Sequence, residues 1–148
     1  MQRRDSLKGA GALAAAAAAG MMNMAYGETE VDQKQKRAER YLDSWNRKDA
    51  EGIGQYLHPE VHFKSPTIET TGKEVFLDAA NRIFPMLQSL LLRHWFVSED
   101  CVVAIYDFNC IAPVGVSRTA ELIRFEDGWI KDVELFFDAR PFVRPANQ

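Results

Sequence analysis

The pattern of hydrophobic and polar residues has a helical period in the first half of the chain. Between residues 34 and 48 the apolar positions are three, one and three residues apart, at Ala38, Tyr41, Leu42 and Trp45. This spacing forms one stripe of an amphipathic helix, with charged residues on the opposite side. Asp49 follows as the expected N-cap of a second short helix, which Pro59 ends.

A short strand and a third helix are predicted next. Residues 61–65 form the strand, which Pro66 stops. After Gly72, the apolar residues from Phe76 to Phe84 share one helical face, and Pro85 closes this helix. The first half of the chain is therefore expected to be mainly helical.

The period changes in the second half, where four β-rich segments follow one another. They cover residues 90–97, 101–112, 116–125 and 129–137. Three residues with turn chemistry separate each segment from the next, so we expect consecutive antiparallel hairpins. Helices followed by long strands predict an α+β fold, with three N-terminal helices packed on a strongly curved, mainly antiparallel sheet. A sheet covered only in part is expected to form a cone with an internal cavity.

Composition limits the function classes. The chain has 148 residues, 47% of them hydrophobic, which fits one globular domain and excludes most two-domain enzymes. The net charge is −3, and three of the 18 basic residues lie within the first eight positions. The remainder is therefore more acidic than the whole, and nucleic acid is not an expected partner because its binding needs clustered Lys and Arg.

The first 27 residues have the layout of a signal peptide. Residues 1–8 are polar and basic, residues 9–20 are mostly Ala, Gly and Leu, and Ala25 and Gly27 are small residues spaced for cleavage. The segment RRDSLK at residues 3–8 resembles a twin-arginine export signal, with Ser6 at a position that is usually Phe. The alternative is a fortuitous basic start before an Ala-rich tract.

We therefore expect a twin-arginine-type signal peptide over residues 1–27 and a mature domain over residues 28–148. Cleavage after Gly27, or after Gly20 as a second choice, would release the domain into the periplasm or the medium. The export machinery is then a transient partner. No stable membrane insertion is expected after cleavage, because the apolar run is shorter than the about 20 residues that a membrane-spanning helix needs.

Cysteine and histidine usage suggests no metal or disulfide framework. Cys101 and Cys110 fall nine residues apart in one predicted strand, which separates them by roughly 30 Å, too far for a disulfide. The three histidines lack the spacing and Cys partners of zinc sites. No Gly-rich phosphate loop or nucleophile elbow is present, so no cofactor is expected.

Three segments carry a family resemblance. They are RYLDSWNRKD at residues 40–49, HPEVHFKSP at 58–66, and AELIRFEDGWI at 120–130, the last followed by Phe137-Asp138. These segments are similar to the SnoaL-like branch of the nuclear transport factor 2-like (NTF2-like) superfamily, to which ketosteroid isomerases belong. The resemblance covers nearly all of residues 28–148 and implies a cystatin-like α+β roll. It constrains function less, because the superfamily includes cyclases, isomerases, dehydratases, epoxide hydrolases and proteins that only bind.

The resemblance to ketosteroid isomerases implies roles for three residues. Tyr41 matches the helix tyrosine, and Glu121 the strand acid, that donate hydrogen bonds to a substrate oxyanion. The position of the catalytic base falls on Ser65, whose hydroxyl is not a carboxylate, so steroid isomerase chemistry is not expected.

Strand alternation gives an independent argument for Glu121. This residue shares a face with Ile123 and Phe125, and an acid between apolar residues is a candidate for the cavity side, where it can stay protonated. The alternatives are that Glu121 faces outward, or pairs with Lys131 or Arg93. Tyr41 could equally be an ordinary core tyrosine.

Further candidates depend on which strand face is inner. Asp107 and Asn109 would form a second polar cluster if the face carrying Val103 and Ile105 lines the cavity, and Asp107 would then replace the missing base. The alternate face of that strand is more apolar. His62 and Lys64 could enter the cavity mouth, and either His62 or Asp107 could shuttle a proton. Trp45 and Trp95 offer aromatic area to a flat ligand, although such residues are more often core.

Two function classes follow. The first is a small enzyme in which Tyr41 and Glu121 stabilise an enolate or alkoxide of a hydrophobic carbonyl compound, by isomerase, cyclase or dehydratase chemistry. The second is a non-catalytic module that binds a hydrophobic small molecule or uses the open sheet face for dimerisation. In both cases three helices cannot cover both faces of the sheet, so a homodimer is expected.

Overall fold

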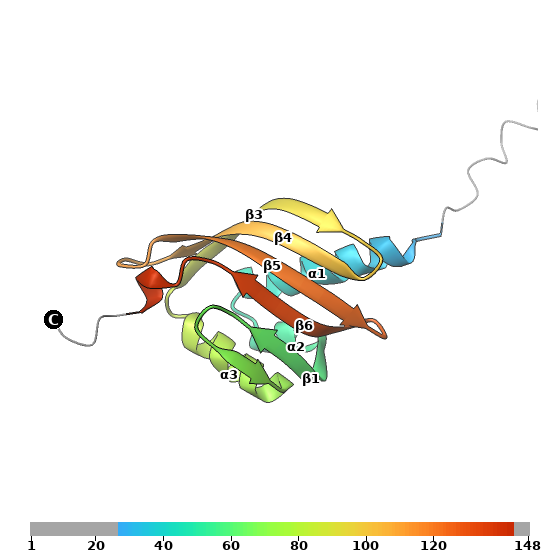
Figure 1. The fold of residues 1–148 in the computed structure, drawn as a ribbon, viewed down its shortest axis with the longest axis horizontal. Helices are drawn as coiled ribbons and strands as arrows, with labels where there is room; N and C mark the ends of the chain where they lie inside the picture. Colours follow the sequence, from blue (N-terminus) through green and yellow to red (C-terminus); the bar gives the residue numbers. More distant parts are fainter. Residues whose placement is uncertain (1–26, 144–148) are drawn as a thin grey trace, which may run out of the picture.

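The computed structural model describes residues 27–143, and residues 1–26 of the predicted signal peptide lie outside this range. Three helices lie against one side of a curved, mixed six-stranded sheet, as the α+β prediction requires (Figure 1). The described elements, in order, are α1 (Glu30–Asn46), α2 (Ala50–Gly54), β1 (Leu57–Lys64), β2 (Glu69–Thr71), α3 (Lys73–Ile83), β3 (Leu87–Val97), β4 (Cys101–Cys110), β5 (Val116–Glu126), β6 (Trp129–Phe136) and the 3-10 turn η1 (Arg140–Phe142). Within this part of the chain, none of the helices is both long and apolar enough to cross a membrane.

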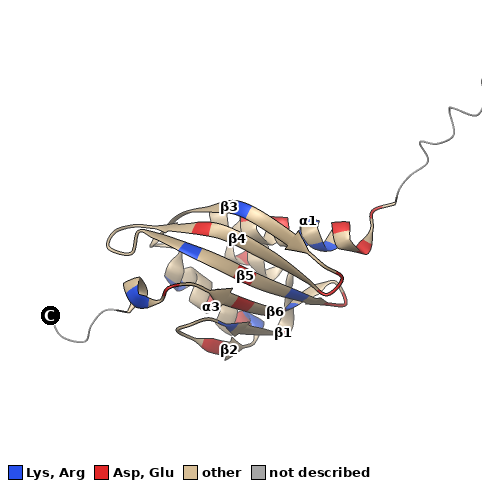
Figure 2. Cartoon of the chain, turned by 45° about the horizontal axis from the view of Figure 1, so that its top comes forward, with Lys and Arg blue, Asp and Glu red and all other residues tan. Residues whose placement is uncertain are grey.

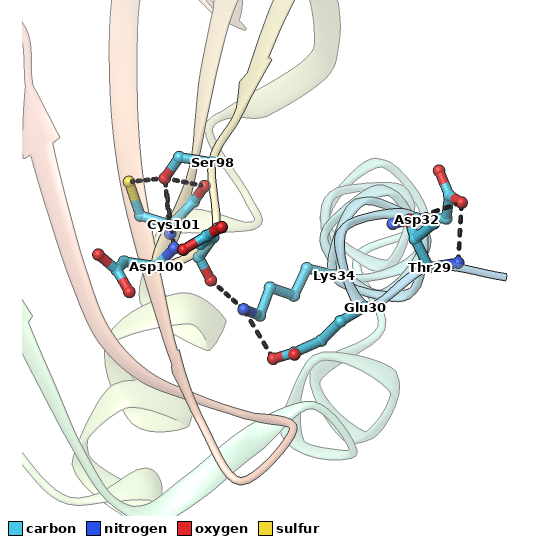
Figure 3. Close-up of polar contacts among 8 residues, drawn as sticks. Thr29, Glu30, Asp32, Lys34, Ser98, Asp100 and Cys101 are labelled. Carbon is cyan, nitrogen blue, oxygen red and sulfur yellow. Dashed lines mark hydrogen bonds and ion pairs between the residues drawn. The ribbon is translucent and has the colours of Figure 1, made fainter.

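Helix α1 begins four residues earlier than its apolar stripe predicts. Thr29 caps it, because its hydroxyl accepts from the Asp32 backbone N–H at 3.1 Å and its own N–H donates to the Asp32 carboxylate at 3.0 Å. Figure 3 shows this reciprocal cap, together with Lys34 of the same helix. The Lys34 ammonium group donates to the Glu99 carbonyl and so connects α1 to the β3–β4 turn. Lys34 also pairs with Glu30 at 3.0 Å. The first turn of α1 is therefore stabilised by polar contacts, and the apolar stripe that predicted the helix does not extend into it.

The second helix is shorter than predicted. Asp49 caps α2 as expected, accepting from the Gly52 N–H at 2.8 Å, but α2 ends at Gly54. Leu57, two residues before the predicted helix end at Pro59, is the first residue of β1, and Pro59 lies within that strand. The pairing of β1 with β6 is irregular between Leu57 and His62. The strand tolerates Pro59 there, because the backbone N–H that proline lacks is not needed for a regular hydrogen-bond ladder.

The sheet has the strand order β2-β1-β6-β5-β4-β3. The predicted consecutive hairpins from β3 to β6 are confirmed, and β1 pairs with β6 in parallel. The three-residue strand β2 was not predicted, and β3 begins at Leu87, three residues before the predicted start. Register shifts in β3 after Leu87 and after Leu92 mark bulges, which bend a sheet.

The helices bury the inner face of the sheet and leave the outer face open. Core residues such as Val102, Ala104 and Ile123 on the inner face are fully buried, and they belong to the same hydrophobic core as apolar residues of α1 and α3. On the outer face, Phe96 and Phe136 are 58% and 52% exposed. Figure 2 looks onto this outer side, where charged residues form separate bands on β3, β4, β5 and β6.

Candidate functional site

A cavity of about 140 Å³ lies between the inner face of the sheet and helices α1 and α3. Its walls are mostly apolar and include the aromatic side chains of Trp45, Phe63, Phe76 and Phe108. The β1–β2 turn and the C-terminal segment with η1 also line it, and both lie at the same end of the sheet (Figure 1). The cavity is therefore an apolar chamber between the helices and the sheet.

One carboxylate and two phenols form the polar centre of this chamber. The Tyr41 hydroxyl donates to Glu121 Oε1 at 2.9 Å, and the Tyr106 hydroxyl donates to Glu121 Oε2 at 2.9 Å. Glu121 is only 2% exposed, and both tyrosines are buried. Tyr41 from α1 and Tyr106 from β4 thus each donate to one oxygen of the carboxylate that β5 carries.

The sequence positions these groups by simple periodicity. Tyr41 belongs to the buried stripe of α1, while Glu121 shares the inner face of β5 with Ser117, Thr119 and Ile123. On β4, Tyr106 lies opposite Thr119 in the antiparallel ladder, two residues along the strand from Ala104, which lies opposite Glu121. The phenol of Tyr106 is thus within reach of the Glu121 carboxylate.

The electrostatics follow from burial. Loss of water raises the pKa of Glu121 to about 7, although the hydrogen bonds from Tyr106 and Tyr41 act in the opposite direction. Burial also raises the pKa of both tyrosines well above the ordinary value, and the charge on Glu121 adds to this effect. Near neutral pH the carboxyl group therefore exists in both protonation states while the phenols stay protonated.

The structure brings four of the predicted residues to the cavity. Tyr41 and Glu121 meet in its centre, which overturns the alternative of an outward-facing Glu121. Trp45 lines the wall and packs edge-on against Phe84, with ring centroids 5.6 Å apart. Ser65 also lines the cavity, but its hydroxyl accepts from the backbone N–H groups of the β1–β2 turn.

Asp107 and Asn109 lie on the outer face of β4, so the structure corrects the prediction that Asp107 supplies a base inside the cavity. Arg93 donates to the Asp107 carboxylate through Nε at 2.8 Å, and Arg118 lies 4.0 Å away. The hydrogen bond from Arg93 lowers the pKa of Asp107. Asn109 instead bonds the Ser89 hydroxyl at 2.8 Å. The reason is strand parity, because the more apolar face of β4 is the inner one.

Three further candidates also lie away from the cavity. His62 and Lys64 are on the outer face of β1, and His62 Nε2 lies 2.9 Å from Glu69 Oε1 while Nδ1 lies 3.3 Å from Asp132 Oδ1. Trp95 packs against the core from the inner face of β3 without lining the cavity. The prediction that His62 enters the mouth and shuttles a proton is therefore corrected as well.

The sequence analysis did not select Tyr106. The signal for it was present, because the apolar face of β4 carries Ala104, Tyr106 and Phe108, and an inner face must be apolar. Thr119 and Ser117, also buried on the inner face of β5, were likewise not selected as cavity residues. Pairing the apolar face of β4 with the face of β5 that carries Glu121 would have found all three.

Comparisons with known proteins place this geometry in a family. Residues 38–133 match the family model described as a SnoaL-like domain. None of the curated proteins is significantly similar to the chain. Many solved structures share the fold, and three of them follow.

Bal32a, from a soil-derived mobile gene cassette, is 16% identical with a TM-score of 0.70, and the match covers 77% of this chain and 96% of that one. A protein from Kribbella flavida is 20% identical with a TM-score of 0.67, over 72% of this chain and 88% of that one. TerC, crystallised with polyporic acid, is 18% identical with a TM-score of 0.66, over 74% and 95%. At these identities the structures show a common fold, and the family model covers most of the chain: this protein belongs to the SnoaL-like family and has the NTF2-like fold.

Proposed function

We propose that the chain binds a hydrophobic carbonyl-type small molecule in its cavity and acts on it by acid–base chemistry of the isomerase, cyclase or dehydratase kind. The observation that carries this proposal is Glu121, held between the hydroxyls of Tyr41 and Tyr106 in an apolar chamber. The similarity to TerC, which was crystallised with polyporic acid, supports an organic ligand in this fold.

The chemistry follows from the two protonation states of Glu121. The neutral carboxyl group donates to a carbonyl oxygen, and the ionised one accepts a proton from the carbon beside that carbonyl. In the second step the phenols turn toward the resulting enolate oxygen and donate to it, and the proton returns from Glu121 to another carbon of the substrate. Among the described residues that line the cavity, Glu121 is the sole carboxylate, so this role, which the sequence assigned to Asp107 or His62, passes to Glu121.

Binding of an enone probe tests the proposal. The substitutions Tyr41→Phe and Glu121→Leu are each expected to weaken binding by roughly 1–3 kcal/mol, the range for losing a buried donor. The double variant should lose less than the sum, because both groups serve one acceptor. Wild-type affinity should fall as pH rises through about 7, since an ionised Glu121 cannot donate.

The matched control is Glu126→Gln, which changes an exposed glutamate on the same strand. Equal affinity in wild type and both single cavity variants would refute the proposal. Steroid isomerisation is expected to be absent or very slow, because Ser65 occupies the base position. Ser65→Asp is the gain-of-function trial.

A second candidate function is binding without turnover, together with dimerisation. The exposed apolar residues on the outer face favour a homodimer that buries this face. Probe binding without conversion of any enone would favour this candidate. The proposal of export through a twin-arginine signal, to the periplasm or the medium, rests on the sequence pattern of residues 1–27.

A further inference from the structure

The polar centre of the cavity offers acceptors when Glu121 is ionised. Both phenol hydrogens point at the carboxylate, one at each oxygen, so the Tyr41 and Tyr106 oxygens present lone pairs to a ligand. The remaining lone pairs of Glu121 are acceptors too. A ligand that meets this arrangement unchanged has to donate hydrogen bonds.

No cation among residues 27–143 balances the charge of Glu121. Tyr41 faces it from α1 and Tyr106 from β4. The residues that α3, β1, β3 and β6 contribute to the cavity carry no titratable side chain. Arg93 and Arg118 pair with Asp107 on the outer face of the sheet. An ionised carboxylate in a low-dielectric chamber gains most from a cation brought in by a ligand.

The walls suit such a cation. Trp45, Phe63 and Phe76 form a chain of edge-to-face pairs, with Trp45 and Phe63 centred 6.2 Å and 5.2 Å from Phe76. Phe108 lines the cavity from β4. Aromatic faces attract ammonium groups, and several of them around one site are a recurring way to bind such cations.

We propose that this cavity binds a hydrophobic primary amine as its ammonium cation, paired with Glu121 and enclosed by the aromatic walls. The inference rests on the proposed function in one respect, that the cavity takes a small organic molecule. A volume of about 140 Å³ limits the enclosed part to about one ring, since a dry protein cavity of about 150 Å³ holds benzene. The ligand class is therefore an amine with one ring and a short arm, of which benzylamine is the simplest probe.

Calorimetric titration with three probes of one size separates the ligand classes. Benzylamine is a cation, benzaldehyde is a carbonyl acceptor, and toluene is neither. Between pH 5.5 and 8, benzylamine affinity should rise by more than about tenfold, because the ionised fraction of an acid with a pKa of about 7 grows by at least that factor. Benzaldehyde affinity should fall over the same range, and toluene affinity should stay constant.

The decisive variant is Glu121→Gln, which keeps the size of the side chain and removes its charge. It should lose benzylamine binding by more than about tenfold at pH 8 and keep toluene binding. Glu126→Gln, the exposed glutamate on β5, should leave all three affinities unchanged. If Glu121→Gln fails to fold, the pH dependence of the wild type decides the question.

The outcomes separate this inference from the proposed function. Benzaldehyde binding that depends on Glu121, without benzylamine binding, overturns the inference and leaves the proposed function standing. If none of the three probes binds, both fall. Benzylamine binding that Glu126→Gln weakens and Glu121→Gln does not is surface attraction, and it also overturns the inference.

Discussion

Glu121 is buried with two hydroxyl donors and, among the residues that the structure describes, without a cation beside it, so its charge depends on pH. Burial disfavours the charge, and two hydrogen bonds recover part of the lost hydration. Since burial is the larger effect, the folded protein holds the proton more tightly than the unfolded chain. The acid therefore links pH to folding as well as to ligand binding.

Stability should fall as pH rises. The pKa of Glu121 is raised from 4.5 to about 7 in the folded state, so its favourable contribution is complete below 4.5 and is lost between 4.5 and 7. Relative to Glu121→Gln, the wild type should lose roughly 3 kcal/mol of unfolding free energy across this window. Urea denaturation at several pH values measures this difference, and parallel stability curves for the two proteins would contradict it.

The phenols should tune the acid independently. Tyr106→Phe and Tyr41→Phe each remove a donor to the carboxylate, so each should raise the pKa of Glu121 further above about 7. Carbon-13 NMR of labelled glutamate carboxyl groups reads this titration directly. An unchanged or lowered pKa in both variants would mean that neither hydroxyl donates to the carboxylate in solution.

Two of the three residues of this polar centre could be identified from the sequence. Tyr41 and Glu121 were accessible because each lies on a periodic stripe and matches a family position. Tyr106 could not be identified in this way, because strand alternation shows which residues share a face but not which of the two faces is the inner one. The same ambiguity placed Asp107 in the cavity, although two arginines hold it on the outer face.

At the scale of elements, the Asn46 side chain makes two hydrogen bonds that join the end of α1 to β3. The Asn46 amide donates to the Leu90 carbonyl at 2.9 Å, and the Leu90 N–H donates to Asn46 Oδ1 at 2.6 Å. Asn46 ends α1, and Leu90 lines the cavity. This pair of bonds fixes the position of β3 beneath the helix.

Removing the amide should loosen this junction. Asn46→Ala leaves a part-buried N–H and carbonyl without their partner, and should destabilise the protein by about 1–3 kcal/mol. Asn81→Ala, at an exposed position on α3, is the matched control and should change stability by less than about 0.5 kcal/mol. Chemical denaturation compares the two. Equal effects would show that the junction adds nothing.

Elements formed by neighbouring residues were predictable, and those formed by distant pairing were not. The hairpins from β3 to β6 follow from local alternation and turns such as Asp127-Gly128, where both residues have positive φ. The parallel pairing of β1 with β6, and the short strand β2, depend on contacts between distant segments. From the sequence, Pro59 indicated the end of a helix. Its place inside β1 could not be foreseen, because a strand accepts a proline there only where the β1–β6 pairing is irregular.

At the scale of the whole molecule, the open sheet face predicts self-association. Phe136 is exposed on β6 in the interior of the sheet. Phe136→Lys should weaken a dimer that buries this face by more than about tenfold, because a charge would enter an apolar contact. Val75→Lys, on the exposed side of α3, should leave association unchanged. Sedimentation equilibrium decides, and a wild-type monomer at micromolar concentration would count against the dimer.

The proposed export depends on residues 1–27 of the full chain. Replacing Arg3 and Arg4 together by Lys should leave the folded domain inside the cell, because a twin-arginine signal is read as paired guanidinium groups. Cell fractionation followed by immunoblotting measures the distribution. Normal export of this double variant would remove the twin-arginine interpretation.

The parallel pairing of β1 with β6 also has a consequence for synthesis on the ribosome. Apart from the short strand β2, β1 finds its neighbour in the sheet only when β6 has been made, after all the residues of α3, β3, β4 and β5. Until then one edge of β1 offers free backbone groups to any other extended chain. A nascent chain stalled before Trp129 therefore exposes an unpaired strand edge that can form hydrogen bonds with other chains. We expect chaperones to bind the chain at that stage.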